Sequence, residues 1–122
     1  MKFEAICLIT EDVPALTRFY EEVLQTTAEG DAIHAEIRTE GASLSIYSRA
    51  AAKEDMKLQF GSSSGNFTMG FLVEDVDQEY ERLHKLGVTI MSEPTTYGWG
   101  RRSMQFQDLD GNVISFASIL GH

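Results

Sequence analysis

His34 and Glu36 are two ionisable side chains separated by one residue, a spacing that could support acid–base chemistry. In an extended strand alternate side chains share a face, so His34 and Glu36 would point the same way. An imidazole beside a carboxylate can act as a general base with its partner. The pair supplies two metal ligands at most, and the neighbouring Arg38 would repel a cation. The pattern therefore indicates either an acid–base pair or the polar wall of a binding site.

Aromatic and hydroxyl side chains suggest a second kind of chemistry, which is ligand binding. The single tryptophan, Trp99, lies between two glycines in the segment PTTYGWG. A large ring in a loop is costly to leave exposed, so it is expected either to stack on a ligand or to pack under the loop. Tyr47 follows Ser43 and Ser45 at alternate positions and would share their strand face.

Two adjacent cations, Arg101 and Arg102, follow the tryptophan segment at the start of an alternating stretch. Alternation sends one of them to each face of a strand, and the sequence does not say which. Arg101 is taken as the candidate ligand-binding cation, which would fix an anionic group of a ligand. The simpler alternative for either arginine is an ordinary surface salt bridge.

The composition limits the partners and the compartment. The chain has 122 residues, enough for one domain, and a formal net charge of −9 that would repel nucleic acids and anionic membranes. The N-terminal segment has the pattern of neither a signal peptide nor a membrane span. Cys7 is the only cysteine, so we expect no disulfide, a cytoplasmic location, and a buried thiol acting as a small apolar side chain.

These residues are carried by a sequence that repeats itself. The motifs ITEDV and LVEDV both close an apolar run and open a helical pattern, and they begin 63 residues apart at Ile9 and Leu72. Asp12 and Asp75 are suited to cap the two helices, which end near residue 24 and at Gly87. The residues expected to face the core from the helices are Val13, Leu16, Tyr20, Val23 and Leu24, then Val76, Tyr80, Leu83 and Leu86.

Alternating stretches predict the strands that surround each helix. In the first half they lie at residues 3–9, 26–29, 32–38 and 43–48, and in the second at 67–73, 88–91, 101–107 and 113–119. The prediction is an α+β domain of two βαβββ modules, residues 1–49 and 67–122, with a flexible linker at 50–66. Each module would leave one face of a mixed sheet uncovered, and a cleft would form where such curved faces meet.

The order of these parts resembles the vicinal oxygen chelate superfamily of glyoxalases, extradiol dioxygenases and bleomycin resistance proteins. The resemblance rests on ITEDVPALTRFYEEVL, GFLVEDVDQEYERLHKLGV and YGWGRRSMQFQDLDGNVISF, and it spans nearly the whole chain. Members that use a metal carry ligands on the first and last strands of each module. Those positions fall here on Ala5, Ser45, Thr68 and Ser115, none of which can anchor a divalent cation.

The resemblance therefore implies a metal-independent binding protein of the bleomycin-resistance type, without a cofactor. It would be a homodimer that sequesters a planar or cationic small molecule, with no nucleic-acid or membrane partner. The expected ligand-binding residues are Trp99, Tyr47, Ser45, Thr68, Ser115, Cys7, His34, Glu36 and Arg101.

Three alternatives remain open at this point. The first is a metal-free isomerase, cyclase or hydrolase in which His34 and Glu36 act as acid and base. The second is a metal enzyme with displaced ligands. The third is a protein that binds a macromolecular partner through an exposed apolar patch.

Overall fold

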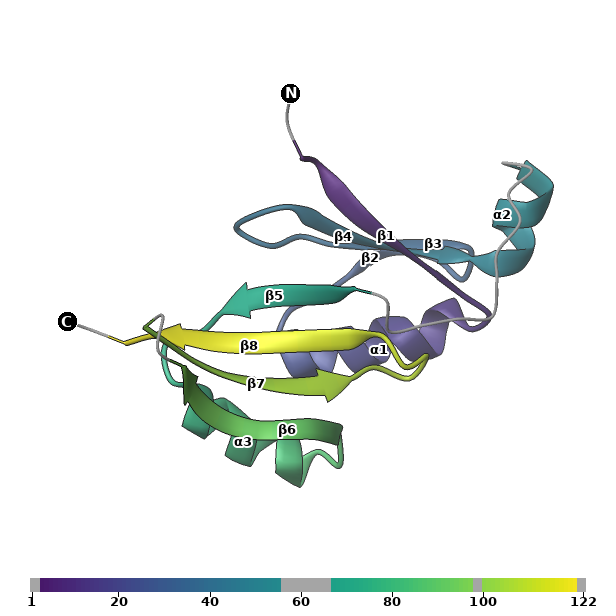
Figure 1. Cartoon of the computed structure of the whole chain (residues 1–122). Coiled ribbons are helices and arrows are strands. Elements are labelled where there is room, and N and C mark those ends of the chain that lie inside the picture. The colour runs from purple at the N-terminus through teal and green to yellow at the C-terminus, as the bar shows by residue number, and fades with distance from the viewer. Residues whose placement is uncertain (1–2, 56–66, 98–99, 121–122) are drawn as a thin grey trace. The chain divides into compact units, whose positions relative to one another are not determined.

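The computed structural model describes residues 3–55, 67–97 and 100–120. The chain divides into two compact units, residues 1–62 and 63–122. Each unit has its own four-stranded mixed sheet with a long helix between its first and second strands, which confirms the repeated βαβββ arrangement. Figure 1 shows the two units by colour, the first running from purple through blue to the teal of α2, and the second from the green-teal of β5 to yellow. No helix among the described residues has the length and apolar character needed to cross a membrane.

The first unit contains β1 (Ala5–Thr10), α1 (Val13–Leu24), β2 (Glu29–Gly30), β3 (His34–Ile37), β4 (Ser43–Ser48) and α2 (Arg49–Asp55). The strands are ordered β1-β4-β3-β2, with β1 parallel to β4 and the other pairs antiparallel. Helix α1 packs on β3 and β4. The parallel pair needs a long crossover, and α1 lies within it.

Helix α1 begins and ends where the sequence predicts. The Asp12 carboxylate accepts a hydrogen bond from the Ala15 backbone N–H at 3.0 Å, which satisfies one of the unpaired amides of the first turn. Gln25 ends the helix in the left-handed conformation at φ 52°. The apolar stripe is buried as expected at Val13, Leu16, Tyr20 and Val23, whereas Leu24 is only half-buried.

The second unit contains β5 (Thr68–Leu72), α3 (Val76–Lys85), β6 (Thr89–Tyr97), β7 (Arg101–Gln107) and β8 (Val113–Ile119). Its order, β5-β8-β7-β6, repeats that of the first unit, and β5 is parallel to β8. Helix α3 packs on β6, β7 and β8. The core of this unit includes Met104, Phe106, Ile114 and Phe116, and the Phe106 and Phe116 rings meet edge to face at 4.9 Å.

The hairpin between β7 and β8 is fixed by one buried carboxylate. Asp108 is 6% exposed and accepts hydrogen bonds from the backbone N–H groups of Asp110 and Asn112 at 2.8 and 2.9 Å. The Asn112 side-chain amide also donates to Asp108, at 2.8 Å. Gly111 has φ of 84°, a conformation in which glycine has no Cβ penalty. This acidic turn is therefore structural.

Several predicted boundaries are wrong. The strand expected at 26–29 is only Glu29–Gly30, and the strand expected at 88–91 extends to Tyr97 with two register shifts. Part of the expected linker at 50–66 belongs to helix α2, while residues 56–66 lie outside the described residues. Leu86 was expected in the core and is 46% exposed, because α3 ends before it.

Candidate functional site

We define face A as the side of the first sheet that points away from α1. Along β1 and β4 the buried side chains Leu8, Leu44 and Ile46 point toward the helix, so the alternate residues point the other way. Face A is made of Ala5, Cys7, Ile9, Glu29, His34, Glu36, Ser43, Ser45 and Tyr47. It contains every residue of the first unit that the sequence predicted to bind a ligand.

The register places four residues of face A side by side across the sheet. Cys7 is paired with Ser45, Ser45 with Glu36, and Glu36 with Glu29. Like charges directly opposite each other repel, and Glu36 is partly compensated by Arg38, whose Nε lies 3.6 Å from its carboxylate. The Arg38 side chain is 78% exposed, so this ion pair is a weak one. This row of face A, from Cys7 to Glu29, therefore presents hydrogen-bond acceptors and negative charge.

His34 and Tyr47 are neighbours on face A, with ring centroids 5.5 Å apart. The Tyr47 hydroxyl lies 3.5 Å from the Asp55 carboxylate, at the limit of a hydrogen bond. His34 is exposed, and no hydrogen bond joins its imidazole to the Glu36 carboxylate. Asp31 accepts hydrogen bonds from the backbone N–H groups of His34 and Ile33, and these lower the pKa of Asp31. The structure brings His34 and Glu36 to one face, and it leaves them without the contact of an acid–base pair.

Cys7 differs from its predicted environment. The thiol was expected to be buried as a small apolar side chain, and instead it is exposed, because Cys7 is on the face of β1 opposite to Leu8. Partial desolvation raises the pKa of Cys7, so the thiol form is favoured. Cys7 contributes a small neutral group to face A.

Face B is the side of the second sheet that points away from α3, and it has a different chemical character. It is made of Thr68, Gly70, Leu72, Thr89, Ser92, Thr95, Tyr97, Arg101, Ser103, Gln105, Gln107, Val113, Ser115, Ala117 and Ile119. The buried Met69, Met104 and Phe116 point the other way. Thr68 and Ser115, both predicted from the sequence, lie on this face, while Leu72 and Ile119 form an apolar end of it, each 62% exposed.

A hydrogen-bonded row crosses face B at the position equivalent to the acidic row of face A. The Ser92 hydroxyl donates to Oε1 of Gln105, and Nε2 of Gln105 donates to the Ser115 hydroxyl at 3.0 Å. A longer contact of 3.5 Å joins the same nitrogen to the Ser103 hydroxyl. Sequence reasoning missed Ser92, Ser103 and Gln105. Alternation within residues 101–107 would have found Ser103 and Gln105 as residues on the face of Arg101.

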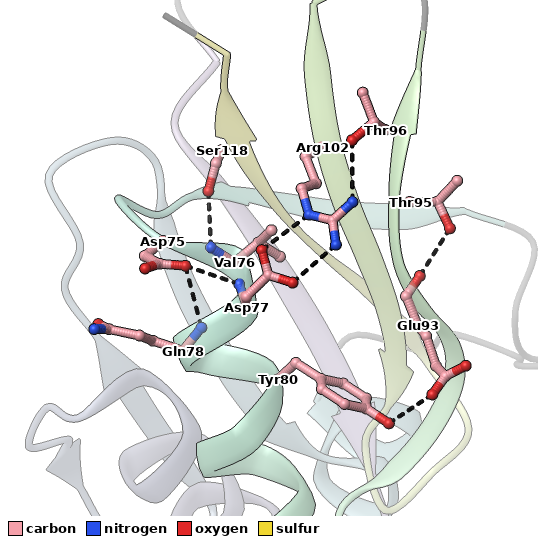
Figure 2. Close-up of polar contacts among 10 residues, drawn as sticks. All are labelled: Asp75, Val76, Asp77, Gln78, Tyr80, Glu93, Thr95, Thr96, Arg102 and Ser118. Atoms are coloured by element: carbon pink, nitrogen blue, oxygen red, sulfur yellow. Dashed lines mark hydrogen bonds and ion pairs between the residues drawn. The ribbon is translucent and has the colours of Figure 1, made fainter.

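The structure decides which arginine faces the helix. Figure 2 shows the Arg102 guanidinium beside Asp77 at the start of α3. The guanidinium donates two hydrogen bonds of 2.9 Å to the Asp77 carboxylate and a third of 3.0 Å to the Thr96 hydroxyl. The hydrogen bonds from Arg102 hold the pKa of Asp77 below its usual range, and the same pair raises the pKa of Arg102. Arg101 is therefore on face B, in register with Tyr97 and Ile119.

Other contacts in Figure 2 anchor α3 to its sheet. The Ser118 hydroxyl accepts a hydrogen bond from the Val76 backbone N–H at 2.8 Å, and Asp75 caps the next two amides at 3.1 and 3.2 Å. The Tyr80 hydroxyl donates to Glu93 at 2.9 Å, and this bond raises the pKa of Tyr80. These polar contacts lie on the helix side of the second sheet, and none of them involves a side chain of face B.

The side chains at the four positions where metal-using members of the resembled superfamily carry ligands do not suit a metal. Ala5 and Ser45 are on face A, and Thr68 and Ser115 are on face B, where they offer a methyl group and three hydroxyls. A neutral hydroxyl alone is a poor ligand for zinc or iron. Across the described parts of the chain, no three His, Cys, Asp or Glu residues are grouped closely enough to hold a metal ion. Trp99, the predicted stacking residue, lies outside the described residues.

The amino-acid sequence is similar to a known protein family and to one curated protein. A family model described as the Glyoxalase/Bleomycin resistance protein/Dioxygenase superfamily matches residues 2–116. The uncharacterized protein YraH of Bacillus subtilis is 28% identical over 128 residues, covering 98% of this chain and all of that protein.

Two solved structures are similar in fold. A glyoxalase/bleomycin resistance protein/dioxygenase from Nocardioides is 24% identical with a TM-score of 0.83, covering 98% of this chain and 84% of the other. A family enzyme from Burkholderia phytofirmans PsJN is 17% identical with a TM-score of 0.82, covering 98% and 100%.

Proposed function

We propose that this chain, which belongs to the Glyoxalase/Bleomycin resistance protein/Dioxygenase superfamily, is a metal-independent protein that binds and sequesters a planar or cationic small molecule. The observation that carries the proposal is the chemistry of the positions that would hold a metal. Ala5, Ser45, Thr68 and Ser115 point away from the helices and lack a metal-binding group. The faces around them supply hydroxyl, aromatic and small side chains, which is a usual lining for a small-molecule site.

Face A supports the preference for a cation. Glu36 and Glu29 lie opposite each other, and Tyr47, which pairs with His34 on the same face, has a ring that can lie against a cationic or planar group. The net charge of −9 adds a long-range attraction for cations. Sequestration would require no bond making, so it fits a face on which His34 and Glu36 are not hydrogen-bonded to each other.

The proposal is tested by direct binding with the whole chain. The two ligands are ethidium, a planar cation, and metal-free bleomycin, a peptide-derived cation. Binding of both is measured by calorimetric titration. Bleomycin binding is also followed by Trp99 fluorescence, with Trp99→Phe as the blank. We expect saturable binding near one ligand per chain. Glu36→Gln should weaken ethidium binding about 3- to 10-fold, the effect of one charge contact in a partly solvated site.

A matched variant separates a local effect from net charge. Glu40→Gln removes the same charge from an exposed residue in the turn before β4, which is not one of the residues of face A, and should leave ethidium affinity unchanged. Equal weakening by both variants would show non-specific electrostatic attraction. If neither compound binds, planar and cationic ligands of this kind are rejected and the alternative of a metal-free enzyme is favoured. The evidence for that enzyme would be a pH-dependent reaction rate that is lost in His34→Ala.

We also propose that the protein is a cytoplasmic homodimer. The single exposed thiol and the lack of a second cysteine fit a reducing compartment. The exposed apolar residues Leu72 and Ile119 lie on the neighbouring strands β5 and β8 of face B and are costly to leave in water. Light scattering coupled to size-exclusion chromatography tests the dimer, whose mass would be twice the 13.6 kDa of one chain.

A further inference from the structure

Face B has a set of hydroxyl donors whose direction is determined by one amide. The Gln105 Oε1 atom can only accept a hydrogen bond, so the Ser92 hydroxyl must donate to it. The Gln105 Nε2 atom can only donate, so the hydroxyl oxygens of Ser115 and Ser103 accept from it, at 3.0 and 3.5 Å. Each of these two serines then has its own hydroxyl proton left to donate.

No described residue accepts a hydrogen bond from the Ser103 or Ser115 hydroxyl. Ser103 is only 9% exposed, so its unused proton is costly to keep without an acceptor. Two donors on neighbouring strands, oriented by one amide, are preorganised to bind an acceptor oxygen.

Space and charge are available beside these donors. Gly70 is paired with Ser115, and a Cβ atom added at Gly70 would meet no atom within 4 Å. Arg101 lies two residues before Ser103 on the same face and is exposed, with no ion pair to any described carboxylate. Residues two apart on a strand are separated by about 7 Å, within the reach of an arginine side chain. A ligand oxygen near Ser103 can therefore meet a neutral donor and a positive charge, and Ser115 supplies a second donor on the neighbouring strand, beside Gln105.

The equivalent row of the first unit has the opposite chemistry. There the positions of Gln105 and Ser92 are occupied by Glu36 and Glu29, which only accept hydrogen bonds when ionised. The two faces thus differ in what they recognise: face A attracts donors and cations, and face B offers donors to acceptor oxygens.

We propose that face B contains a subsite for a carboxylate group of the ligand. The Ser103 and Ser115 hydroxyls donate to its oxygens, Arg101 supplies the compensating charge, and Gln105 is a positioning residue that orients the hydroxyls. This subsite rests on the proposed small-molecule binding function and adds to it a specificity for acceptor oxygens.

The test uses three probes with one aromatic body and different polar groups: 2-naphthoate, 2-naphthamide and 2-naphthylmethylammonium. Affinities are measured for the whole chain by saturation-transfer NMR titration. We expect 2-naphthoate to bind more tightly than the ammonium compound, with the amide between them. Ser115→Ala and Arg101→Met should each weaken 2-naphthoate about 5- to 30-fold, the effect of one hydrogen bond to a charged group.

The decisive variant is Gln105→Glu. A carboxylate at this position accepts from all three serine hydroxyls, so their protons turn away from the ligand and their lone pairs face it. The preference should then reverse, with 2-naphthoate binding lost and ammonium binding gained. Gln78→Glu introduces the same charge at an exposed position of α3 and should leave the preference unchanged.

Each outcome separates this inference from the proposed function. A preference of the wild-type protein for the ammonium probe, or an unchanged preference in Gln105→Glu, overturns the carboxylate subsite. If ethidium or bleomycin binds while 2-naphthoate does not, the subsite is rejected and the binding function stands. If 2-naphthoate binds as expected while ethidium and bleomycin do not, the subsite stands and the preference for cations is rejected.

Discussion

Gly30 is the position at which a single methyl group should do most damage to face A. It has φ of 134°, and a Cβ atom added there would lie 2.2 Å from the His34 carbonyl oxygen and 2.6 Å from the Ala35 Cα. Both of these are backbone atoms of β3, so they cannot rotate away as a flexible side chain could. Strand β2 must therefore move by about 1 Å from β3 to restore normal contact.

The cost of Gly30→Ala follows from two terms. A non-glycine residue in this conformation costs about 1 to 3 kcal/mol, and weakening the backbone hydrogen bond from Asp31 to His34, now 2.9 Å long, costs about 0.5 to 1.5 kcal/mol. The expected loss is about 2 to 4 kcal/mol of unfolding free energy. With a urea slope of about 2 kcal/mol per molar, the midpoint should fall by about 1 to 2 M.

Urea unfolding followed by far-ultraviolet circular dichroism measures this loss, and Gly41→Ala is the control. Gly41 has no positive φ, and its added Cβ would meet only the Thr39 hydroxyl, at 3.9 Å. That variant should be neutral or more stable by about 0.4 to 1 kcal/mol, because it restricts the unfolded chain. If Gly30→Ala unfolds at the wild-type midpoint, the reasoning from its φ and its contacts is refuted.

Two further predictions concern the second unit. Leu83→Ala, at a fully buried position of α3, should lower the free energy of unfolding by about 2 to 5 kcal/mol, measured by thermal unfolding. Leu109→Ala, at a residue that is 61% exposed, is the control and should change it by less than about 0.5 kcal/mol. Similar losses in both variants would contradict the burial of Leu83. Arg102 lowers the pKa of Asp77 in the folded protein, so this carboxylate contributes stability above its unfolded pKa, and the contribution is lost as pH falls through the folded pKa. Asp77→Asn should therefore be less stable than wild type near pH 7 and approach it between about pH 5 and pH 2, and a constant difference over that range would reject the assignment.

Local patterns were enough to predict most elements of the fold. The strands at 43–48, 101–107 and 113–119 have the predicted bounds, and both helices start at their predicted caps, Asp12 and Asp75. Alternation and capping are properties of neighbouring residues, so they can be recognised without knowing the tertiary structure. The same alternation placed His34 with Glu36 and Ser45 with Tyr47, and the register of β3 and β4 puts both pairs on face A.

The errors occurred where a local pattern was weak or where distant residues decided the outcome. Strand β2 is limited to Glu29–Gly30, and Gly30 lies close to the β3 backbone, a contact that no pattern within residues 26–29 predicts. The helix at Arg49–Asp55 follows β4 directly, in a segment whose composition suggested a linker. Leu86 continued the apolar spacing of α3, but the helix ended before it.

The sequence alone determined the repeated βαβββ order, because short-range periodicity is a property of neighbouring residues. It also determined that the positions indicated by the family resemblance, Ala5, Ser45, Thr68 and Ser115, carry side chains unsuited to a metal, because side-chain chemistry does not depend on the fold. The tertiary structure decided that Arg102 binds Asp77 and leaves Arg101 on face B, and that Gln105 donates to the hydroxyls of Ser103 and Ser115. These relations join residues from different strands and a helix. They depend on the register of the sheet, which is set by the packing of the whole unit.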